Sequence, residues 1–194
     1  MGCSPSVEQS QSFTRTVAFL GLDGSGKSSV VHKIVSSDTS SDDFLPIPTA
    51  VADFYEMSLS ASKFRIYDCG GLGRYRDQWP FYITQADAIA FVIDRTDKQR
   101  MGVVRDEIKT IFTQCQQQQI PVLIYLNKSD KKSSLTVKDF KMITKIADFK
   151  LEYHFIDCSA KSGKGVIEGR DWLLQHIKPR SSVVTSGTNN TSNK

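Results

Sequence analysis

Residues 21–28 have the types and spacing of a phosphate-binding loop. They read Gly-Leu-Asp-Gly-Ser-Gly-Lys-Ser, which fits the pattern G-x-x-x-x-G-K-S. An apolar run over 17–20 predicts a buried strand before the loop, and apolar residues at helical spacing over 27–35 predict a helix after it. Glycines let backbone N–H groups turn toward a polyphosphate, and the helix N-terminus adds positive partial charge. A glycine-rich turn without a ligand is the alternative interpretation.

The side chains of this loop indicate which atoms would meet phosphate and metal. Lys27 is long enough to reach the β- and γ-phosphates, and the Ser28 hydroxyl is suited to bind Mg²⁺. The loop residues expected to surround the phosphates are Asp23, Gly24, Ser25, Gly26, Lys27, Ser28 and Ser29.

A second motif, Asp68-Cys69-Gly70-Gly71, closes the apolar run over 63–68. Downstream of a phosphate-binding loop, an acidic residue at a strand end followed by glycine completes the phosphate site, although the same residues are common in turns. We expect Asp68 to hold Mg²⁺ through water and the Gly71 N–H to contact the γ-phosphate. The runs over 51–57 and 63–68 lie close enough in sequence to predict an antiparallel hairpin.

The predicted strand over 120–126 ends in Asn127-Lys128-Ser129-Asp130, a base-reading motif. A carboxylate at Asp130 can accept hydrogen bonds from both N1–H and the exocyclic amine of guanine, whereas adenine lacks this donor pair. Lys128 is expected to pack along the base, and Asn127 to tie its loop to the phosphate-binding loop. The strand over 152–158 is followed by Ser159, Ala160 and Lys161, where the Ala160 N–H would donate to guanine O6.

The remaining periodic segments complete an alternating pattern. A strand is predicted over 88–94, and helices are predicted over 101–119, 136–147 and 165–177. Strands that alternate with helices predict an α/β domain whose functional loops follow the strand C-termini. We assign this domain to residues 15–178, between a flexible N-terminal tail (1–14) and a disordered polar tail (179–194).

Composition excludes several classes. The net charge of +4 gives no indication of nucleic-acid binding. Neither a membrane-spanning run nor the apolar core of a signal peptide is present in the sequence. The four cysteines have no metal-like spacing, so we expect reduced thiols in a cytoplasmic protein.

The first residues fit a lipid-attachment signal. Gly2 and Ser6 match the N-myristoylation pattern, and Cys3 beside them is a possible palmitoylation site. One myristoyl chain gives marginal membrane binding and a second chain makes it stable, so the pair predicts peripheral attachment to a membrane surface. A tail that merely begins with glycine is the alternative.

Taken together, the motifs resemble those of the small GTPase superfamily over residues 15–178. The phosphate-binding loop, Ile47-Pro48-Thr49, Asp68–Gly71 and 168–173 are similar to its ARF and ARF-like (ADP-ribosylation factor-like) branch. Residues 73–79 and 97–101 are most similar to the ciliary ARF-like subgroup that recruits the BBSome coat.

This resemblance implies a P-loop NTPase fold with a six-stranded mixed sheet, one strand of it antiparallel. It implies GTP and GDP as ligands, Mg²⁺ as cofactor, and Thr49 as a Mg²⁺ ligand when GTP is bound. The implied partners are an exchange factor, a GTPase-activating protein and a coat or trafficking effector. A ciliary base or ciliary membrane is the implied location.

The chain departs from the branch at a catalytic position. After the two glycines of the second motif, the family usually has a glutamine that orients the attacking water, and this chain has Leu72. An alkyl side chain cannot hydrogen-bond water, so we expect impaired hydrolysis. The sequence leaves open whether Leu72 is native or introduced. Lys27, Thr49, Gly71 and Leu72 are the catalytic positions, and no arginine is recognisable as a finger supplied in cis.

Two further departures concern the surface. Ala50-Val51-Ala52 replaces the family's Ile-Gly-Phe, so the effector surface loses an aromatic residue. Its expected members are Tyr67, Trp79 and Tyr82. Residues 3–14 also lack the apolar periodicity of the amphipathic N-terminal helix found in ARF proteins, so attachment would depend on lipid.

The sequence therefore predicts a guanine-nucleotide switch with weak GTPase activity that recruits a trafficking effector. A GTP-binding scaffold without catalysis is the alternative. A P-loop kinase is disfavoured, because the base-reading motif is present and an arginine-rich lid is not visible in the sequence.

Overall fold

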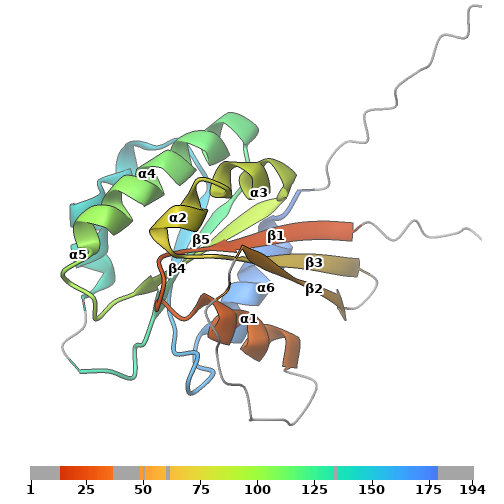
Figure 1. Ribbon diagram of the computed structural model, residues 1–194, viewed down its shortest axis with the longest axis horizontal. Coiled ribbons are helices and arrows are strands. Elements are labelled where there is room, and N and C mark those ends of the chain that lie inside the picture. The colour runs from red at the N-terminus through yellow and green to blue at the C-terminus, as the bar shows by residue number, and fades with distance from the viewer. Residues whose placement is uncertain (1–13, 37–48, 50, 60–61, 133–134, 179–194) are drawn as a thin grey trace, which may run out of the picture.

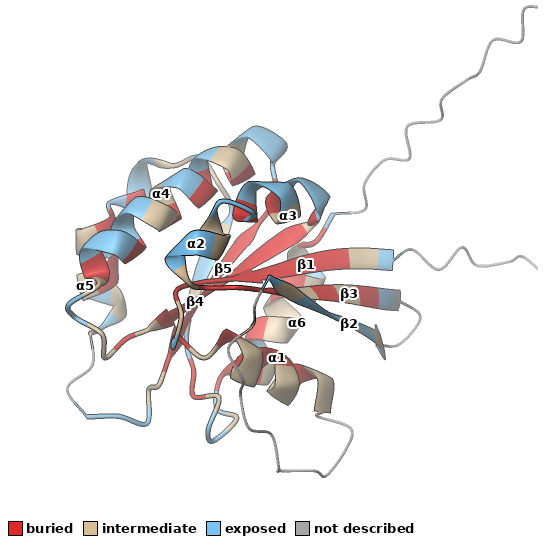
Figure 2. Cartoon of the chain, in the orientation of Figure 1, coloured by how far each residue is buried: buried red, intermediate tan, exposed pale blue. Residues whose placement is uncertain are grey.

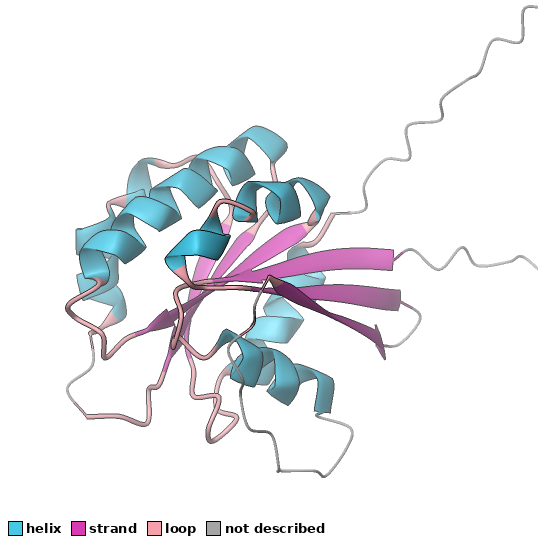
Figure 3. Ribbon diagram, viewed as in Figure 1, coloured by secondary structure: helices cyan, strands magenta, loops and turns pink. Residues whose placement is uncertain are grey.

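A computed structural model describes residues 14–36, 49, 51–59, 62–132 and 135–178. Helices cover both faces of a twisted sheet (Figures 1 and 3). The strands are β1 (Thr14–Leu20), β2 (Ala52–Leu59), β3 (Ser62–Cys69), β4 (Ala88–Asp94), β5 (Val122–Asn127) and β6 (Tyr153–Asp157). The helices are α1 (Lys27–Val35), α2 (Gly73–Arg76), α3 (Trp79–Gln85), α4 (Met101–Gln118), α5 (Val137–Thr144), the 3₁₀ helix η2 (Ile146–Asp148) and α6 (Val166–His176).

The sheet has six strands in the order β2-β3-β1-β4-β5-β6. β2 and β3 are antiparallel, and every other neighbouring pair is parallel. This confirms the expected mixed sheet and the hairpin. Because β1 lies between β3 and β4, the chain leaves its C-terminal end at the point where strand order reverses, which is where open α/β sheets bind ligands.

The core has two layers, one on each face of the sheet. α1 and α6 pack on one face, around Val30, Val31 and Leu173. α3, α4 and α5 pack on the other, around Ile83, Ile108 and Phe140. The central strands are buried on both faces, as Figure 2 shows, which explains their continuous apolar sequence.

The helix predicted over 136–147 ends early. A capping box between Thr136 and Asp139 begins α5, but Lys145 adopts the left-handed conformation and closes the helix after Thr144. The Lys145 N–H donates to the Lys141 carbonyl at 3.1 Å. The turn redirects the chain into η2, which places Ile146 in the core.

The aromatic segment over 74–85 forms helices that the sequence did not predict. Pro80 lies at the start of α3, where its fixed φ favours helix and its missing N–H costs nothing. This geometry directs Trp79 inward, where its indole Nε1–H donates to the Gly70 carbonyl at 3.0 Å. Trp79 is only 3% exposed, so its expected place on the effector surface is wrong. Trp172 of α6 is half-buried and stacks on His176.

The predicted tails, with Gly2 and Cys3, lie outside the described residues apart from Thr14. Among the helices of the described part, none is long and apolar enough to cross a bilayer.

Candidate nucleotide-binding site

The sequence motifs meet at one edge of the sheet. The phosphate-binding loop follows β1, and the base-reading motif begins at the end of β5 (Figure 1). The Asn127 side-chain amide donates to the Ser25 carbonyl at 2.8 Å, as predicted. Lys128 Nζ donates to the Gly24 carbonyl at 2.8 Å and to Asp94 Oδ2 at 2.6 Å. Asn127 and Lys128 therefore join the phosphate and base regions.

Gly26 is required by the shape of this junction. Its φ is +90°, and a Cβ there would lie 2.3 Å from Asn127 Nδ2. A side chain would strain the backbone and displace the amide that ties the loops together. Helix α1 begins at the next residue, so its free N–H groups face the loop.

Lys27 supplies the positive charge of the loop from a buried position. Its Nζ donates to the Leu22 carbonyl at 3.1 Å. Burial lowers the pKa of the Lys27 ammonium, and the negative charges of Asp68 and Asp23 oppose that shift. A phosphate would satisfy the remaining donors of this ammonium and offset the cost of its burial.

Ser28, Thr49 and Asp68 converge as the predicted metal site requires. Ser28 Oγ lies 3.3 Å from Thr49 Oγ1, which donates to Asp68 Oδ2 at 3.4 Å. The other oxygen, Asp68 Oδ1, is buried and has no hydrogen-bond partner within the described part of the chain. Burial raises the pKa of Asp68, against hydrogen bonds that favour the carboxylate. Two hydroxyls and an orphan carboxylate oxygen fit a hydrated Mg²⁺ whose other ligands are phosphate oxygens.

The predicted base-reading carboxylate is held in place by the neighbouring loop. Ser159 Oγ donates to Asp130 Oδ1 at 2.7 Å. This hydrogen bond lowers the pKa of Asp130, which keeps the exposed carboxylate ionised as an acceptor. Ser159 itself is buried and accepts the Ser162 N–H at 3.2 Å, so it positions Asp130 and does not face the base.

The other predicted base contacts are less direct. The Ala160 N–H donates to Asn127 Oδ1 at 3.0 Å, so a guanine O6 would have to share or displace this bond. Lys161 is exposed at the rim, and Ser29 is half-buried in the first turn of α1.

Gly71 joins the second motif to the phosphate-binding loop. A Cβ at Gly71 would lie 2.5 Å from the Asp23 nitrogen. The Gly71 carbonyl accepts the Asp23 N–H at 3.2 Å and Arg76 Nε at 2.8 Å. Leu72 follows in extended conformation, half-buried, and begins α2. Its side chain has no polar atom with which to hold water.

Two arginines that sequence reasoning missed reach this loop. Arg76 Nη2 lies 3.5 Å from Asp23 Oδ1, and Arg100 Nη1 donates to the same oxygen at 3.0 Å. Both lie in segments that carry the subgroup resemblance, 73–79 and 97–101, but no role was predicted for either and nothing in their spacing indicates that they share a partner.

An aromatic cluster lies beside the site on β2, β3 and α3. Tyr67 and Tyr82 have ring centroids 5.3 Å apart, as expected of neighbours on one surface. Phe54, which is 51% exposed, packs against Tyr67 with ring centroids 5.9 Å apart and the rings tilted by 46°. Sequence reasoning missed Phe54. Strand alternation could have identified it, because residues 52 and 54 lie on the same face of β2. Phe54 therefore restores the aromatic residue lost at Ala52.

Comparison with known proteins identifies the family. The model of the ADP-ribosylation factor family matches residues 6–177. The chain belongs to that family. It is 34% identical over 166 residues to ADP-ribosylation factor-like protein 6 of Danio rerio, covering 84% of this chain and 88% of that protein. It is 27% identical over 165 residues to human ADP-ribosylation factor-like protein 5A, covering 84% of this chain and 90% of that protein.

A solved structure shares the fold. The Arl6 BBS3 small GTPase of Trypanosoma brucei, bound to the nucleotide analogue GppNp, aligns with a TM-score of 0.76 and 23% identity. The alignment covers 87% of this chain and all of that one. The chain is thus an ARF-like small GTPase, a member of a family of GTP-binding switches, as its motifs predicted.

Proposed function

We propose that this ARF-like protein binds GTP and GDP with Mg²⁺ and recruits a membrane-trafficking effector in its GTP form. The convergence of Ser28, Thr49 and Asp68 carries the proposal, because Thr49 reaches the metal site from the segment before β2. A γ-phosphate and its metal would hold Thr49 there, and loss of the phosphate would release it. Nucleotide state would then change the surface next to Phe54 and Tyr67.

Three residues of the chain determine the rate of GTP hydrolysis that we expect. Lys27 and the Gly71 N–H would stabilise charge on the γ-phosphate, while bound Mg²⁺ would neutralise part of the phosphate charge. Leu72 leaves the attacking water without a side-chain partner. Hydrolysis should therefore be slow and depend on a GTPase-activating protein, and an exchange factor would be needed to replace GDP.

Single-turnover hydrolysis tests this proposal. The protein and its Leu72→Gln variant are loaded with GTP and Mg²⁺, and released phosphate is followed. The glutamine amide can orient water, so the variant should hydrolyse GTP at least about tenfold faster. A matched Leu72→Met variant, which is uncharged and similar in volume, should remain slow.

The alternative is a GTP-bound scaffold that has given up catalysis. It predicts that Leu72→Gln gains nothing, because other parts of the hydrolytic machinery are also missing. The identity of the nucleotide released from purified protein also tests whether Leu72 holds the protein in its GTP-bound form. Mostly GTP would support a form held active by Leu72, whereas mostly GDP would mean that hydrolysis survives or that GDP binds more tightly.

Location follows from the lipid signal and the resemblance. We propose acylation at Gly2, with Cys3 as a second site, and attachment to the cytoplasmic face of a membrane at the ciliary base or cilium. Myristate on Gly2 is detectable by mass spectrometry of protein from eukaryotic cells, and Gly2→Ala should abolish it. The BBSome coat is the effector we propose.

A further inference from the structure

The phosphate-binding loop carries an acidic residue, Asp23, where it should disfavour the ligand. Its carboxylate is 40% exposed and lies within electrostatic reach of Lys27, the ammonium suited to hold the β- and γ-phosphates. Its backbone N–H bonds the carbonyl of Gly71, the expected γ-phosphate sensor. A free carboxylate here would repel the phosphates, and it would repel the terminal one of GTP most.

Asp23 is not free, because two arginines hold it. Arg100 donates two hydrogen bonds to Asp23, from Nη1 to Oδ1 and from Nη2 to the backbone carbonyl, both at 3.0 Å. Arg76 Nη2 approaches the same carboxylate oxygen at 3.5 Å. Outer carboxylates hold both arginines in turn. Arg100 Nε donates to Asp97 Oδ2 at 2.5 Å, and Arg76 Nη1 donates to Glu107 Oε1 at 3.2 Å.

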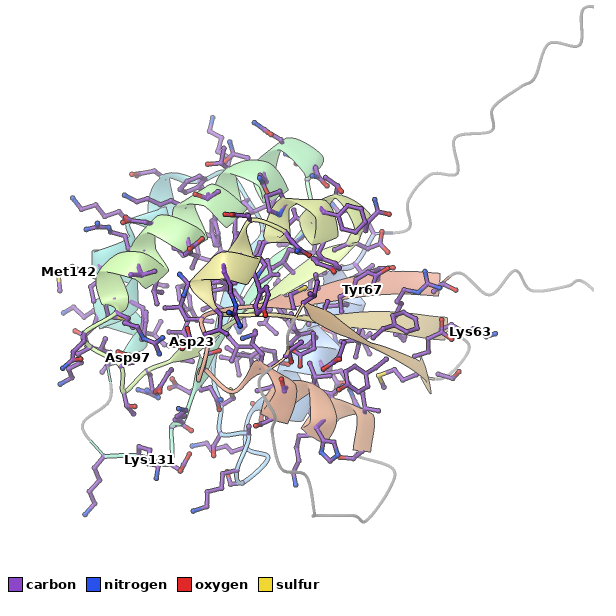
Figure 4. All side chains as sticks on the ribbon, viewed as in Figure 1. Asp23, Lys63, Tyr67, Asp97, Lys131 and Met142 are labelled. Carbon is purple, nitrogen blue, oxygen red and sulfur yellow. The ribbon has the colours of Figure 1, made fainter. Side chains whose placement is uncertain are left out.

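These contacts form one chain of alternating charge, Glu107–Arg76–Asp23–Arg100–Asp97, which we call the Asp23 ion-pair chain. It runs from α4 through α2 and the phosphate-binding loop to the residues after β4. Figure 4 shows Asp23 and Asp97 close together at the loop end of the sheet.

The position of Arg100 is not explained by helix stability. It is the N-cap residue of α4, where a cation meets the positive end of the helix dipole. Its backbone N–H donates to Asp97 Oδ1 at 3.2 Å, and its Nε donates to the other oxygen of the same carboxylate. The two terminal nitrogens of the guanidinium are directed to Asp23.

We infer that Arg100 is a positioning residue that makes this loop selective for the nucleoside triphosphate. It neutralises the Asp23 carboxylate and holds it toward α4, so that the γ-phosphate meets Lys27 and backbone N–H groups without an opposing charge. Arg76 assists from α2, and its bond to the Gly71 carbonyl links the same carboxylate to the γ-phosphate sensor. This inference rests on the proposed binding of GTP and GDP.

Affinities for two nucleotides test the inference. Fluorescent GDP and fluorescent GppNHp, a GTP analogue that resists hydrolysis, are titrated in excess Mg²⁺ against nucleotide-free full chain. Arg100→Met is the informative variant because Arg100 borders a small cavity with Leu22 and Val104, and methionine keeps an apolar stem there. Arg105→Met is the matched control, since Arg105 is exposed on α4 and pairs only with the adjacent Asp106.

Arg100→Met should weaken GppNHp binding by about tenfold and GDP binding by less than about threefold. A difference of this size is usual for interaction energies between neighbouring charged residues. Arg100→Lys, which keeps the charge, should retain most of the preference. The double variant Asp23→Asn with Arg100→Met should regain GppNHp affinity, because the charge that Arg100 neutralises is gone. Arg105→Met should match the unchanged protein.

Equal weakening of both nucleotides, or no recovery in the double variant, would overturn the inference, because either result would mean that Arg100 only orders the loop. If the unchanged protein binds neither nucleotide, the proposed function itself fails and the inference fails with it. An intact preference in Arg100→Met would reject the inference alone.

Discussion

Asp130 is the residue that we propose decides which base is bound. Ser159 fixes one of its oxygens at 2.7 Å, and the carboxylate remains exposed toward the loop edge. A buried or fixed acceptor that loses its donor is costly, which is why such a group rejects the wrong base more strongly than an apolar pocket would.

Replacing Asp130 with asparagine should change base preference. The amide presents a donor in place of one acceptor, so it opposes the exocyclic amine of guanine and suits xanthine, which has an oxygen at that carbon. We expect GDP affinity to fall by about 100-fold and XDP affinity to rise. Competition of GDP and XDP against a fluorescent nucleotide measures both, with Asp139→Asn as an exposed control. Unchanged GDP affinity in Asp130→Asn would remove Asp130 from the base site.

The sequence predicted single residues well where chemistry depends on a short local pattern. Lys27 and Ser28 belong to one short motif, and Asn127 and Asp130 belong to another. The Asn127–Ser25 hydrogen bond confirms the predicted link between the two loops. Arg100 could not be predicted, because its partner Asp23 is 77 residues away and the pairing depends on how α4 docks. Trp79 was placed on the surface because the sequence did not predict that α3 begins at this residue, where its indole is buried.

At the scale of elements, strand alternation decides which side chains lie on the proposed effector surface. β2 is the edge of the sheet, and Phe54 pairs directly with Tyr67 of β3. Arg65 lies over the Phe54 ring at 5.2 Å and Tyr67 packs against it, yet Phe54 remains 51% exposed and accessible to a partner.

We expect Phe54→Ala to weaken effector binding without weakening nucleotide binding. The ring is exposed and contacts only its surface neighbours, and removing such an aromatic anchor typically costs about 2 kcal/mol in an interface, or roughly thirtyfold in affinity. Binding of purified BBSome to the GppNHp-loaded protein measures this effect. Val103→Ala, which removes an exposed apolar side chain on α4, is the control. Equal effects of the two substitutions would contradict a specific surface at Phe54.

The early end of α5 shows the limit of periodicity as a predictor. Apolar residues continue at helical spacing past Thr144, so the pattern alone favours a longer helix. The chain instead turns at Lys145, with φ 49° and ψ 40°, which lets Ile146 reach the core. Tertiary burial of one isoleucine outweighs the local cost of a lysine in the left-handed region.

Lys145→Gly should therefore stabilise the protein. Glycine adopts this conformation without steric cost, and the expected gain is about 0.5–1 kcal/mol. The same substitution inside the helix, Met142→Gly, should instead destabilise by about 1 kcal/mol, because Met142 is exposed and contributes mainly helix propensity. Urea unfolding at fixed nucleotide and Mg²⁺ concentrations measures both. Destabilisation by Lys145→Gly would mean that the lysine side chain itself supports the turn.

On the scale of the whole molecule, the alternation of strands and helices predicted the sheet and its loop edge. The antiparallel β2 and β3 followed from the short separation of two apolar runs, and the family resemblance implied six strands with one antiparallel. The strand order itself was not predicted from the sequence. At the loop edge of the sheet, polar residues lie between the two core layers. Lys27 and Asp68 are buried there, and Asp68 Oδ1 has no hydrogen-bond partner among the described residues. A bound anion would satisfy the remaining donors of Lys27, and a bound cation would satisfy this oxygen.

We therefore expect the stability of the folded chain to depend on bound nucleotide and Mg²⁺. A ligand that binds only the folded chain stabilises it by about 4 kcal/mol when present at a thousand times its dissociation constant, which corresponds to roughly 10 °C in the melting temperature of a chain of this length. We expect chelation of Mg²⁺ and removal of nucleotide to lower the melting temperature by about that amount. Restoring GDP and Mg²⁺ should reverse the loss, whereas ADP and Mg²⁺ should not, because adenine lacks the donors that Asp130 accepts.

Asp68→Asn should bind nucleotide but lose most of the response to Mg²⁺, since the unpaired oxygen then belongs to a neutral amide. A chain that melts at one temperature in all of these conditions would not use Lys27 and Asp68 to hold a nucleotide, and their burial would need another compensating partner.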